Sequence, residues 1–538
     1  MSESEVTVNQ VSATNGVTLR STAEACPPAM TFEQSASGFL ELLRRLFSFP
    51  AMLGMILVGG VYLNAREFIV DPDCWWHIKT GQLILATRHW PHGDPYSYTV
   101  AGHPWLSYEW GGDVVLALFE RWGGLRGLEA FLILVAGATL LALYGLATIC
   151  AKNAKAGFVA TIVLIALALP SFSLRPQMLG YLFLILTLIA LELFRQGKRG
   201  ALWFLPILFL VWVNTHGSWI IGLGTVVAYW FAGLFEFQLG NLEVRRWSQP
   251  DRQRLSFVFL LSLCALPITP YGIELCTYPF QVASSLPISV ANILEWQPMP
   301  FQMPGGKFFL ALILGFIVLQ VIFRFAWRLE TLALFLFGTA MAVIHVRFIL
   351  LFVPFSAPVL AAILARWVPA YNRAKDQFIL NAVLMIAASV AMIYYFPSRA
   401  MLEDKVAANF PVGAVAYLDN HDVPGPLLNT YGFGGYLVWA RGPEHKVFID
   451  GRSELYEAGG LLNDYLQVLD IKPAGLAVLR FYGIKSLLLD RGEPLVTVLN
   501  ALPEWQEVYF DNRSVIFVRR EPVAPVADSK ISKPAGQE

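Results

Sequence analysis

The chain has 538 residues, of which 56% are hydrophobic and only 14% are charged. Soluble domains are usually about 45–50% apolar and about 25% charged, so this composition excludes an ordinary soluble protein. Lysine plus arginine and aspartate plus glutamate each number 39, which excludes a protein that holds nucleic acid through a net positive field. Five cysteines without a Cys-x-x-Cys pair exclude a disulfide scaffold. The class that remains is a polytopic membrane protein.

Long apolar blocks follow a polar N-terminus. Residues 1–36 contain no apolar run, which predicts a disordered cytoplasmic tail and not a signal peptide, and 521–538 are predicted to be a second disordered tail. About 20 apolar residues in a helix cross the hydrocarbon core of a bilayer. We therefore expect a polytopic α-helical membrane domain over 37–396 with about eleven transmembrane helices. These spans are expected near 46–64, 128–150, 156–172, 177–194, 201–214, 218–236, 254–270, 307–323, 329–344, 347–366 and 377–396.

Lysine and arginine set the expected orientation. They are more frequent in the loops that share a side with the N-terminus, which predicts a cytoplasmic N-terminus in an inner (plasma) membrane. An odd number of spans then puts the C-terminal region on the outer, extracytoplasmic face. Two loops expected on that face, 65–127 and 271–306, are too long to be simple connectors, and such loops usually carry function.

The C-terminal region differs in pattern from the apolar blocks. Residues 397–520 combine short helix and strand patterns, with strands expected at 446–452 and 483–490 and a hairpin at 507–520, which predicts a soluble α/β domain. The glycine cluster within 429–442 either lets backbone and aromatic rings pack closely or contacts a ligand.

Acidic side chains stand where the first span ends. Asp71 and Asp73 lie there, and carboxylates at a membrane exit suit a divalent-cation site or the removal of a proton from an acceptor. Polar residues can also simply mark the water side of a helix end. His77, Asp94 and Glu109 follow in the same loop, and its histidines lack the spacing of a zinc-binding helix. The tryptophans of this loop are also compatible with an interfacial belt.

Three further charged residues lie close to the apolar blocks. Glu295 stands alone in an apolar loop, where an unpaired acid has a raised pKa. Arg175 lies in a short turn between two spans, and Arg347 lies at the outer end of a span. An arginine at membrane depth is costly unless it meets an anion, and its planar fork fits a phosphate. The alternatives are a solvated glutamate and two arginines that extend to the lipid headgroups.

The order of these motifs resembles the membrane-embedded GT-C glycosyltransferases, in particular the catalytic subunit of oligosaccharyltransferase. That family has an Asp followed at the third position by an aromatic residue; Asp73 with Trp76 is similar, and Asp71 could take the same place. Pro170 and Arg175 keep the family's spacing in the second outer turn.

The second half of the chain continues the resemblance. The segment NILEWQP at 292–298 resembles the glutamate motif of the family's other long loop. Val346, Arg347 and Pro354 repeat the Val-Arg motif of a later span. YGFGGYLVW, which starts at Tyr431, resembles the region of the family's Trp-Trp-Asp-Tyr-Gly motif, and VFIDGR resembles the strand after it.

The resemblance implies a function and a set of site residues. The function is the transfer of a sugar or glycan from a polyprenyl-phosphate-type lipid donor to an acceptor at the extracytoplasmic face. The partners would be membrane lipid, this donor and a protein, lipid or polysaccharide acceptor, without nucleic acid. Asp73, Asp71 and Glu295 would be catalytic, and Arg347 and Arg175 would bind the donor phosphate. Further acceptor or loop contacts would come from His77, Asp94, Glu109, Tyr431, Asp450 and Arg452.

The sequence also departs from the family pattern. The second outer turn continues as PQMLGYLFL, without the acidic pair that helps to hold a divalent cation, so Mg²⁺ or Mn²⁺ on Asp73 and Asp71 would lack part of its ligand set. Asn429–Thr430–Tyr431 replaces Trp-Trp-Asp, which argues against ordinary glycosylation of Asn-x-Ser/Thr sequons. An alternative function is a non-catalytic scaffold that binds or assembles lipid-linked glycan. A transporter is disfavoured, because its matching broken spans are absent from the sequence.

Overall fold

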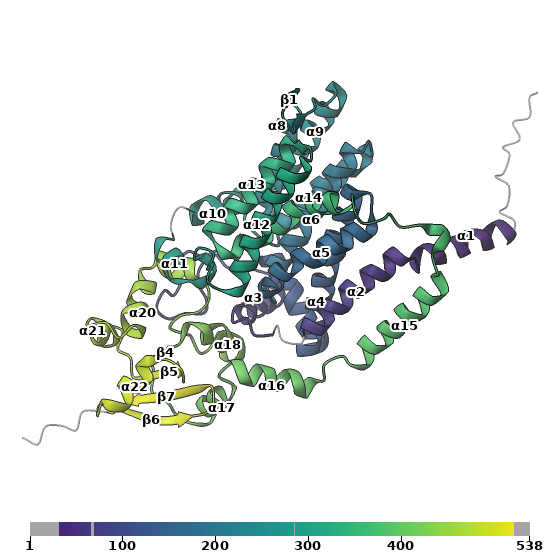
Figure 1. Cartoon of the computed structure of the whole chain (residues 1–538). Coiled ribbons are helices and arrows are strands. Elements are labelled where there is room, and N and C mark those ends of the chain that lie inside the picture. Colours follow the sequence, from purple (N-terminus) through teal and green to yellow (C-terminus); the bar gives the residue numbers. More distant parts are fainter. Residues whose placement is uncertain (1–31, 66–68, 284–285, 521–538) are drawn as a thin grey trace, which may run out of the picture.

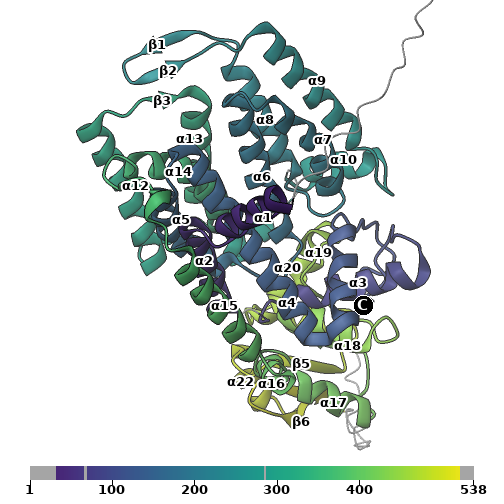
Figure 2. The same ribbon diagram turned by 90° about the vertical axis from the view of Figure 1, so that its right-hand side faces the viewer.

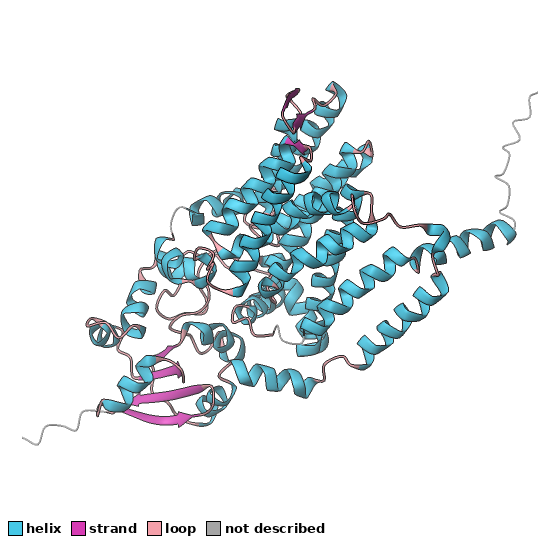
Figure 3. Cartoon of the chain, in the orientation of Figure 1, coloured by secondary structure: helices cyan, strands magenta, loops and turns pink. Residues whose placement is uncertain are grey.

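The computed structural model describes residues 32–65, 69–283 and 286–520, and most of the chain is helical (Figures 1 and 3). Long helices form a bundle, and a smaller unit with a β-sheet lies at one end of it. Helix α1 (Phe32–Leu46) begins inside the predicted N-terminal tail. The rest of that tail and the predicted C-terminal tail lie outside the described residues.

Helix occupies each of the eleven ranges predicted as spans. Among the described residues, five helices are long and apolar enough to cross a membrane, or up to seven if each of two bent pairs is one span. These helices confirm a polytopic membrane protein, whereas the number eleven stays a prediction. The five are α4 (Trp110–Ala151), α5 (Ala154–Ala168) with the 3-10 turn η1 (Leu169–Ser171), α6 (Gln177–Arg195), α12 (Pro304–Phe323), and η4 (Val346–Phe348) with α14 (Ile349–Leu364).

The other helices in the predicted membrane domain are shorter. Of these, η2 with α7, α8 and α13 are apolar helices of 10 to 17 residues, and α2 and α15 belong to the two bent pairs. These helices are α2 (Phe49–Ala65), α7 (Phe204–Val213), which follows the 3-10 turn η2 (Arg199–Trp203), α8 (Trp219–Ala232), α9 (Gln249–Ala265), α13 (Leu329–Ile344) and α15 (Phe378–Tyr394), which follows η5 (Arg373–Lys375).

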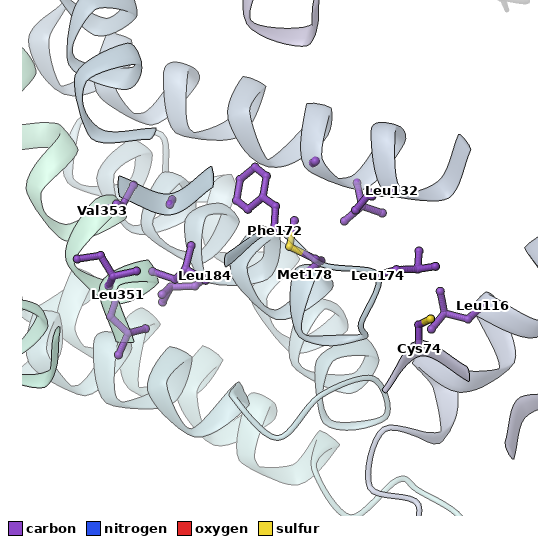
Figure 4. Packing of buried hydrophobic residues seen from close by; sticks show 14 of the residues in the cluster. Cys74, Leu116, Leu132, Phe172, Leu174, Met178, Leu184, Leu351 and Val353 are labelled. Atoms are coloured by element: carbon purple, nitrogen blue, oxygen red, sulfur yellow. The ribbon is translucent and has the colours of Figure 1, made fainter. Parts of the chain in front are cut away.

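Helix α4 runs through the middle of the bundle and packs against α3 (Cys74–Thr87), α5, α6 and α14. Gly124 breaks α4 with φ 56° and ψ −139°, a conformation that favours glycine because it has no Cβ. In Figure 4, Cys74 of α3 lies against Leu116 of α4, and Leu174 lies beside them; all three are buried. This core fixes the start of α3 and the turn before α6, the two places that carry Asp73 and Arg175.

The second long loop contains short helices of its own. They are α10 (Ile273–Ala283), α11 (Pro287–Asn292) and the 3-10 turn η3 (Leu294–Trp296). The carboxylate of Glu457, from the C-terminal unit, accepts hydrogen bonds from the backbone N–H of Ile288 at 2.7 Å and of Ser289 at 2.8 Å. The start of α11 is therefore attached to the C-terminal unit, because these N–H groups have no partner within the helix.

The C-terminal unit has a four-stranded sheet in the order β4-β5-β7-β6, with β4 parallel to β5 and the other neighbours antiparallel. Central residues such as Leu487, Leu488 and Phe517 are buried. The strands are β4 (Leu427–Asn429), β5 (Ser486–Asp490), β6 (Trp505–Phe510) and β7 (Ser514–Arg519), and the helices are α16 (Arg399–Asn409), α17 (Val412–Asn420), α18 (Tyr431–Arg441), α19 (Ser453–Ala458), α20 (Leu461–Leu469), α21 (Gly475–Phe481) and α22 (Pro494–Ala501).

One predicted strand of this unit is wrong. The hairpin at 507–520 is confirmed as β6 and β7, and β5 falls within the predicted strand 483–490. Residues 446–452 instead form an extended segment whose one bridge joins Val447 to Ser97 of the first loop. Val447, Phe448 and Ile449 are buried, so their apolar run fits a segment enclosed between two parts of the chain, which has the same pattern as a core strand.

A second, small sheet lies at the other end of the bundle, as the two views in Figures 1 and 2 agree. Its strands are β1 (Phe237–Leu239), β2 (Leu242–Val244) and β3 (Trp327–Arg328). Strand β2 pairs antiparallel with β1 and parallel with β3, so this sheet joins the chain after α8 to the chain before α13.

Candidate functional site

Three carboxylates from two distant parts of the chain meet at one guanidinium group. Arg175 Nε lies 2.6 Å from Asp71 Oδ2, its Nη2 lies 3.0 Å from Asp73 Oδ2, and its Nη1 lies 3.2 Å from Glu295 Oε1. The side chains of Asp71, Asp73 and Arg175 are 7%, 14% and 18% exposed, whereas that of Glu295 is 42% exposed. The structure thus brings together four of the residues that the sequence singled out. All three polar edges of Arg175 are already occupied by carboxylates.

Local backbone structure positions these groups. The Asp71 carboxylate accepts a hydrogen bond from the Asp73 backbone N–H at 2.9 Å, which folds the chain into the turn that starts α3. Arg175 lies in the short turn between η1 and α6, and Glu295 lies in η3. The Val346 N–H donates to the Gln297 carbonyl at 3.0 Å, so the glutamate motif and the Val-Arg motif are joined directly.

Burial changes the acidity of Asp73. Desolvation, the largest cause, raises the pKa of Asp73 to about 7, and the neighbouring charges of Asp71 and Glu295 raise it further, while Arg175 lowers it. A carboxyl group with a pKa close to neutral can both accept and return a proton at physiological pH. This property suits a group that removes a proton from an acceptor.

The C-terminal unit closes one side of the site. A Cβ placed on Gly451 would lie 1.7 Å from Asp73 Oδ1, and one placed on Gly435 would lie 2.3 Å from the Pro72 carbonyl oxygen. Tyr431 donates from its hydroxyl to the Gly451 carbonyl at 2.9 Å, and burial raises its pKa well above the ordinary value, with Asp73 contributing. The glycines at 435 and 451 therefore serve close packing against the first loop.

We expect Gly451→Ala to lower the sugar transfer predicted from the sequence about a hundredfold, since a displacement of about 1 Å at a reacting group has an effect of this size. The new methyl group would collide with the Asp73 carboxylate. The measurement is turnover of the purified variant, together with its thermal stability. Gly432→Ala is the matched control, because a Cβ at Gly432 meets nothing within 4 Å. Equal activity of the two variants would contradict the close approach.

Arg347 lies on the other side of Glu295 and differs from Arg175 in its partners. Its guanidinium carbon lies 4.3 Å from the ring centroid of Trp296, a cation–π contact. No ion pair joins Arg347 to a carboxylate within the described parts of the chain. A cavity beside it is lined by Tyr181 and Leu184 of α6, Trp212 and His216, and the Arg347 side chain itself. Arg347 is therefore a half-buried cation that is available to an anion.

A buried chain of polar side chains connects the first loop, the start of α4 and the turn before α8. His77 Nδ1 lies 2.6 Å from Asp113 Oδ1 and His77 Nε2 lies 3.4 Å from Glu109 Oε2, while His216 Nε2 lies 3.1 Å from Glu109 Oε1. Ser107 donates to Asp113 at 2.6 Å. Burial raises the pKa of Glu109 well above its ordinary value and lowers that of His216 to about 3. The Glu109 carboxyl is thus held between two imidazoles and fixes their orientation.

Sequence reasoning missed Asp113, His216 and Gly451. Asp113 is one of three acids in the apolar stretch that becomes α4, and His216 lies in the short VNTHGSW segment between two apolar blocks. For Asp113 and His216 the one signal available was a polar residue next to an apolar block, a position at which a functional role is the first hypothesis in membrane proteins.

Asp94, Asp450 and Arg452 form an ion-pair cluster away from Arg175 and Arg347. Arg452 Nη2 lies 2.8 Å from Asp94 Oδ1 and 2.6 Å from Asp450 Oδ2, and all three side chains are 0% exposed. Tyr456 donates to Asp450 at 2.7 Å, and the guanidinium of Arg452 lies 4.6 Å from the ring centroid of Trp105. The cluster joins the first loop to the C-terminal unit, and the predicted ligand contacts of these residues stay a prediction.

We expect Arg452→Met to destabilise the protein by about 3–5 kcal/mol, because two buried carboxylates would lose their cation. Thermal unfolding followed by tryptophan fluorescence in detergent measures the effect. Arg480→Met, at an exposed position of the same unit, should leave the unfolding temperature unchanged. If Arg452→Met were as stable as this control, the cluster would not hold the two parts together.

The geometry also tests the expected divalent cation. Three carboxylates in one place have suitable chemistry, but the Arg175 guanidinium fills the position between them. Over the described ranges, no group of three or more His, Cys, Asp or Glu side chains is arranged to hold a metal ion. The residues as placed do not fit Mg²⁺ or Mn²⁺ on Asp73 and Asp71.

Comparison with known proteins gives structural similarities. No family model and no curated protein matches the chain. It is similar in structure to the Archaeoglobus fulgidus oligosaccharyltransferase tethered to an acceptor peptide with an NVT sequon, at 11% identity and a TM-score of 0.48, over 81% of this chain and 68% of that one. The mycobacterial arabinofuranosyltransferase AftD has 14% identity and a TM-score of 0.47 over 88% and 41%.

A third similar structure is ArnT from Cupriavidus metallidurans bound to undecaprenyl phosphate, with 13% identity and a TM-score of 0.44 over 90% of this chain and 98% of that one. The solved structures to which this chain is similar thus include an oligosaccharyltransferase, the enzyme that its motifs resemble.

Proposed function

We propose that the protein is a membrane glycosyltransferase that moves a sugar or glycan from a polyprenyl-phosphate-type lipid donor to an acceptor on the extracytoplasmic face. The observation that carries this proposal is the meeting of Asp71, Asp73 and Glu295 at Arg175, while Arg347 forms no ion pair among the described residues. A base and an unpaired cation at the edge of a bundle of apolar helices suit a reaction in which a phosphate leaves.

The donor phosphate is assigned to Arg347. Its guanidinium stacks on Trp296 and makes no ion pair within the described residues, so an anion can bind without displacing one. The cavity beside it is small, about 50 Å³, and apolar side chains of α6 and α14, such as Leu184 and Leu351, line it together with Arg347. Arg175 takes a different part from the one expected from sequence. It holds the three carboxylates in position.

The proposed reaction is a substitution at the anomeric carbon of the donor sugar. The acceptor nucleophile forms a bond to this carbon while the bond from the carbon to the phosphate oxygen breaks. Asp73 accepts the proton that the acceptor loses, and the lipid phosphate keeps the electron pair of the broken bond beside Arg347. Glu295, the most exposed of the three carboxylates, lies where an acceptor would approach.

We further propose that this transfer needs no resident divalent cation. The guanidinium of Arg175 lies between the three carboxylates, and its positive charge offsets their mutual repulsion. A bound metal ion would offset this repulsion in the same way. Turnover that is unchanged by EDTA would agree with this proposal. Loss of turnover in EDTA and its recovery with Mg²⁺ or Mn²⁺ would overturn it.

The test of the function uses the purified full chain in lipid nanodiscs. A panel of polyprenyl-phosphate and polyprenyl-diphosphate sugars is supplied with a membrane extract as the source of acceptor, and release of the lipid phosphate is followed. Release by the wild type and by Asp422→Asn, an exposed control, but not by Asp73→Asn, would support the transferase. Donor binding without release under every condition would favour the non-catalytic scaffold. Absence of binding would overturn both functions.

A further inference from the structure

A cavity with two different parts lies at the end of the bundle opposite the C-terminal unit. One part is a crevice between α4, α6, α13 and α14, and the other is an open chamber beside the small sheet of β1, β2 and β3. Cys150, Glu192 and the 326–328 segment line both parts, so the crevice and the chamber adjoin each other. No residue of the candidate site lines either part.

The crevice is mostly apolar, and its charged lining residues are Glu192, Arg328 and Arg366. Its walls come from side chains such as Leu188, Leu334, Phe355 and Val359, and from Ala362 of α14. Two prolines inside α14, at 354 and 358, also line it. A crevice of this kind between membrane helices is filled either by side chains or by hydrocarbon, because water gains no hydrogen bonds there.

The chamber is cationic. Five lysine or arginine side chains and three glutamates line it. Four of these charges cancel: Glu192 lies 3.3 Å from Arg328 and 3.5 Å from Arg195, and Arg195 also pairs with Glu330. The other cations are Lys152, Arg245 and Arg246, and Arg245 alone reaches a glutamate, Glu243 at 3.5 Å. Lys152 and Arg246 make no ion pair with any described residue.

We propose that this cavity binds a membrane lipid with an anionic phosphate headgroup, with the headgroup at Lys152 and Arg246 and an acyl chain in the crevice. The shape and the charge of the cavity favour the same kind of ligand. The crevice suits a hydrocarbon chain, and the unpaired cations of the adjoining chamber suit an anion. Basic pockets between membrane helices recognise anionic headgroups through the same forces. In the predicted topology the cavity faces the cytoplasmic leaflet, where anionic lipids concentrate.

The proposal concerns a site distinct from the donor site. The lipid at this cavity is a resident ligand and not a substrate, since Asp73 and Arg347 lie among the residues of the other end of the bundle. Its expected effect is to join α4 to β2 and β3, because Lys152 follows α4, Arg246 follows β2, and Arg328 belongs to β3.

Native mass spectrometry of the purified, delipidated full chain tests the proposal. Dioleoylphosphatidylglycerol is the anionic probe, dioleoylphosphatidylcholine the neutral one, and glycerol 1-phosphate the headgroup alone. We expect the wild type to bind one phosphatidylglycerol roughly tenfold more tightly than phosphatidylcholine, and the double variant Lys152→Gln/Arg246→Gln to lose this preference. Lys198→Gln/Arg324→Gln, two exposed cations outside the cavity, is the charge-matched control and should keep it.

Two more variants separate the possible sources of binding. Ala362→Phe narrows the crevice without changing the charge, and it should weaken phosphatidylglycerol binding while the elution volume of the protein stays the same. Arg347→Gln should leave this binding unchanged, since binding lost there would place the lipid in the donor site. Equal loss in the control pair, binding of glycerol 1-phosphate as tight as that of the lipid, or no preference in the wild type would each overturn the proposal.

Discussion

Asp73→Asn should lower turnover by about 10²–10⁴-fold, the usual contribution of a general base. The asparagine keeps the size of the side chain and can still contact Arg175, but it accepts no proton. Binding of the lipid-linked donor should change little, because the donor phosphate is assigned to Arg347. The measurement is release of lipid phosphate at saturating donor, with Asp422→Asn as the control for loss of one exposed carboxylate.

The pH dependence of turnover gives the same prediction a second readout. The base must be ionised to act, and burial raises the pKa of Asp73 to about 7. Turnover should therefore rise with pH through about 7 and level off above it, and it should fall about tenfold for each pH unit well below that value. Arg175 lowers the pKa of Asp73, so Arg175→Gln should move the rise to higher pH. A profile that stays flat from pH 5 to 8 would contradict Asp73 as the base.

Arg347→Gln is the second substitution with a large expected effect. Charge develops on the departing phosphate in the transition state, and loss of one donor to such a charge lowers turnover by about 10²–10³-fold. Arg347→Lys should recover part of the rate, since a lysine keeps the charge but loses the planar fork and the stacking on Trp296. Donor affinity and turnover are measured separately, because a ground-state contact alone would change affinity and not turnover.

Arg480→Gln is the matched control for Arg347→Gln, since it removes one exposed guanidinium from the C-terminal unit. A comparison with Arg175→Gln then separates the two buried arginines. Arg175→Gln should shift the pH profile, while Arg347→Gln should lower the plateau without shifting it. If Arg347→Gln shifted the pH profile and Arg175→Gln lowered only the plateau, the roles proposed for the two arginines would have to be exchanged.

The apolar helices and the main charged groups of the site could be predicted from sequence. Asp73 stands out in the sequence as an acid at a membrane exit, Glu295 as a lone acid in an apolar loop and Arg175 as a cation at membrane depth. The cost of an isolated charge in such places explains why they gather around one another once folded. The partner of each group could not be predicted. Arg175 was expected at a phosphate, because the sequence does not show that three acids reach it first.

The contact between the C-terminal unit and Asp73 could not be predicted from the sequence either. Gly451 lies in a segment whose apolar residues have the pattern of a strand, and only the packing of 446–452 against the first loop shows that a backbone atom touches Asp73. The His77–Glu109–His216 chain depends on contacts between α3, the start of α4 and the turn before α8. Glu109 and His216 are more than 100 positions apart in the chain, and patterns within one segment carry no information about such a contact.

The buried Arg452 cluster has a consequence for chimeric proteins. If the C-terminal unit were exchanged between related chains, its Arg452 would have to pair with the residue that replaces Asp94 in the other chain. Its Gly451 would likewise have to pack against the first loop of that chain. The part of the chain that can be exchanged is therefore discontinuous. Residues 71–105 of the first loop and residues 397–520 must come from the same parent protein. A library that recombines these two segments as one block should yield folded chimeras far more often than a library that crosses over between them.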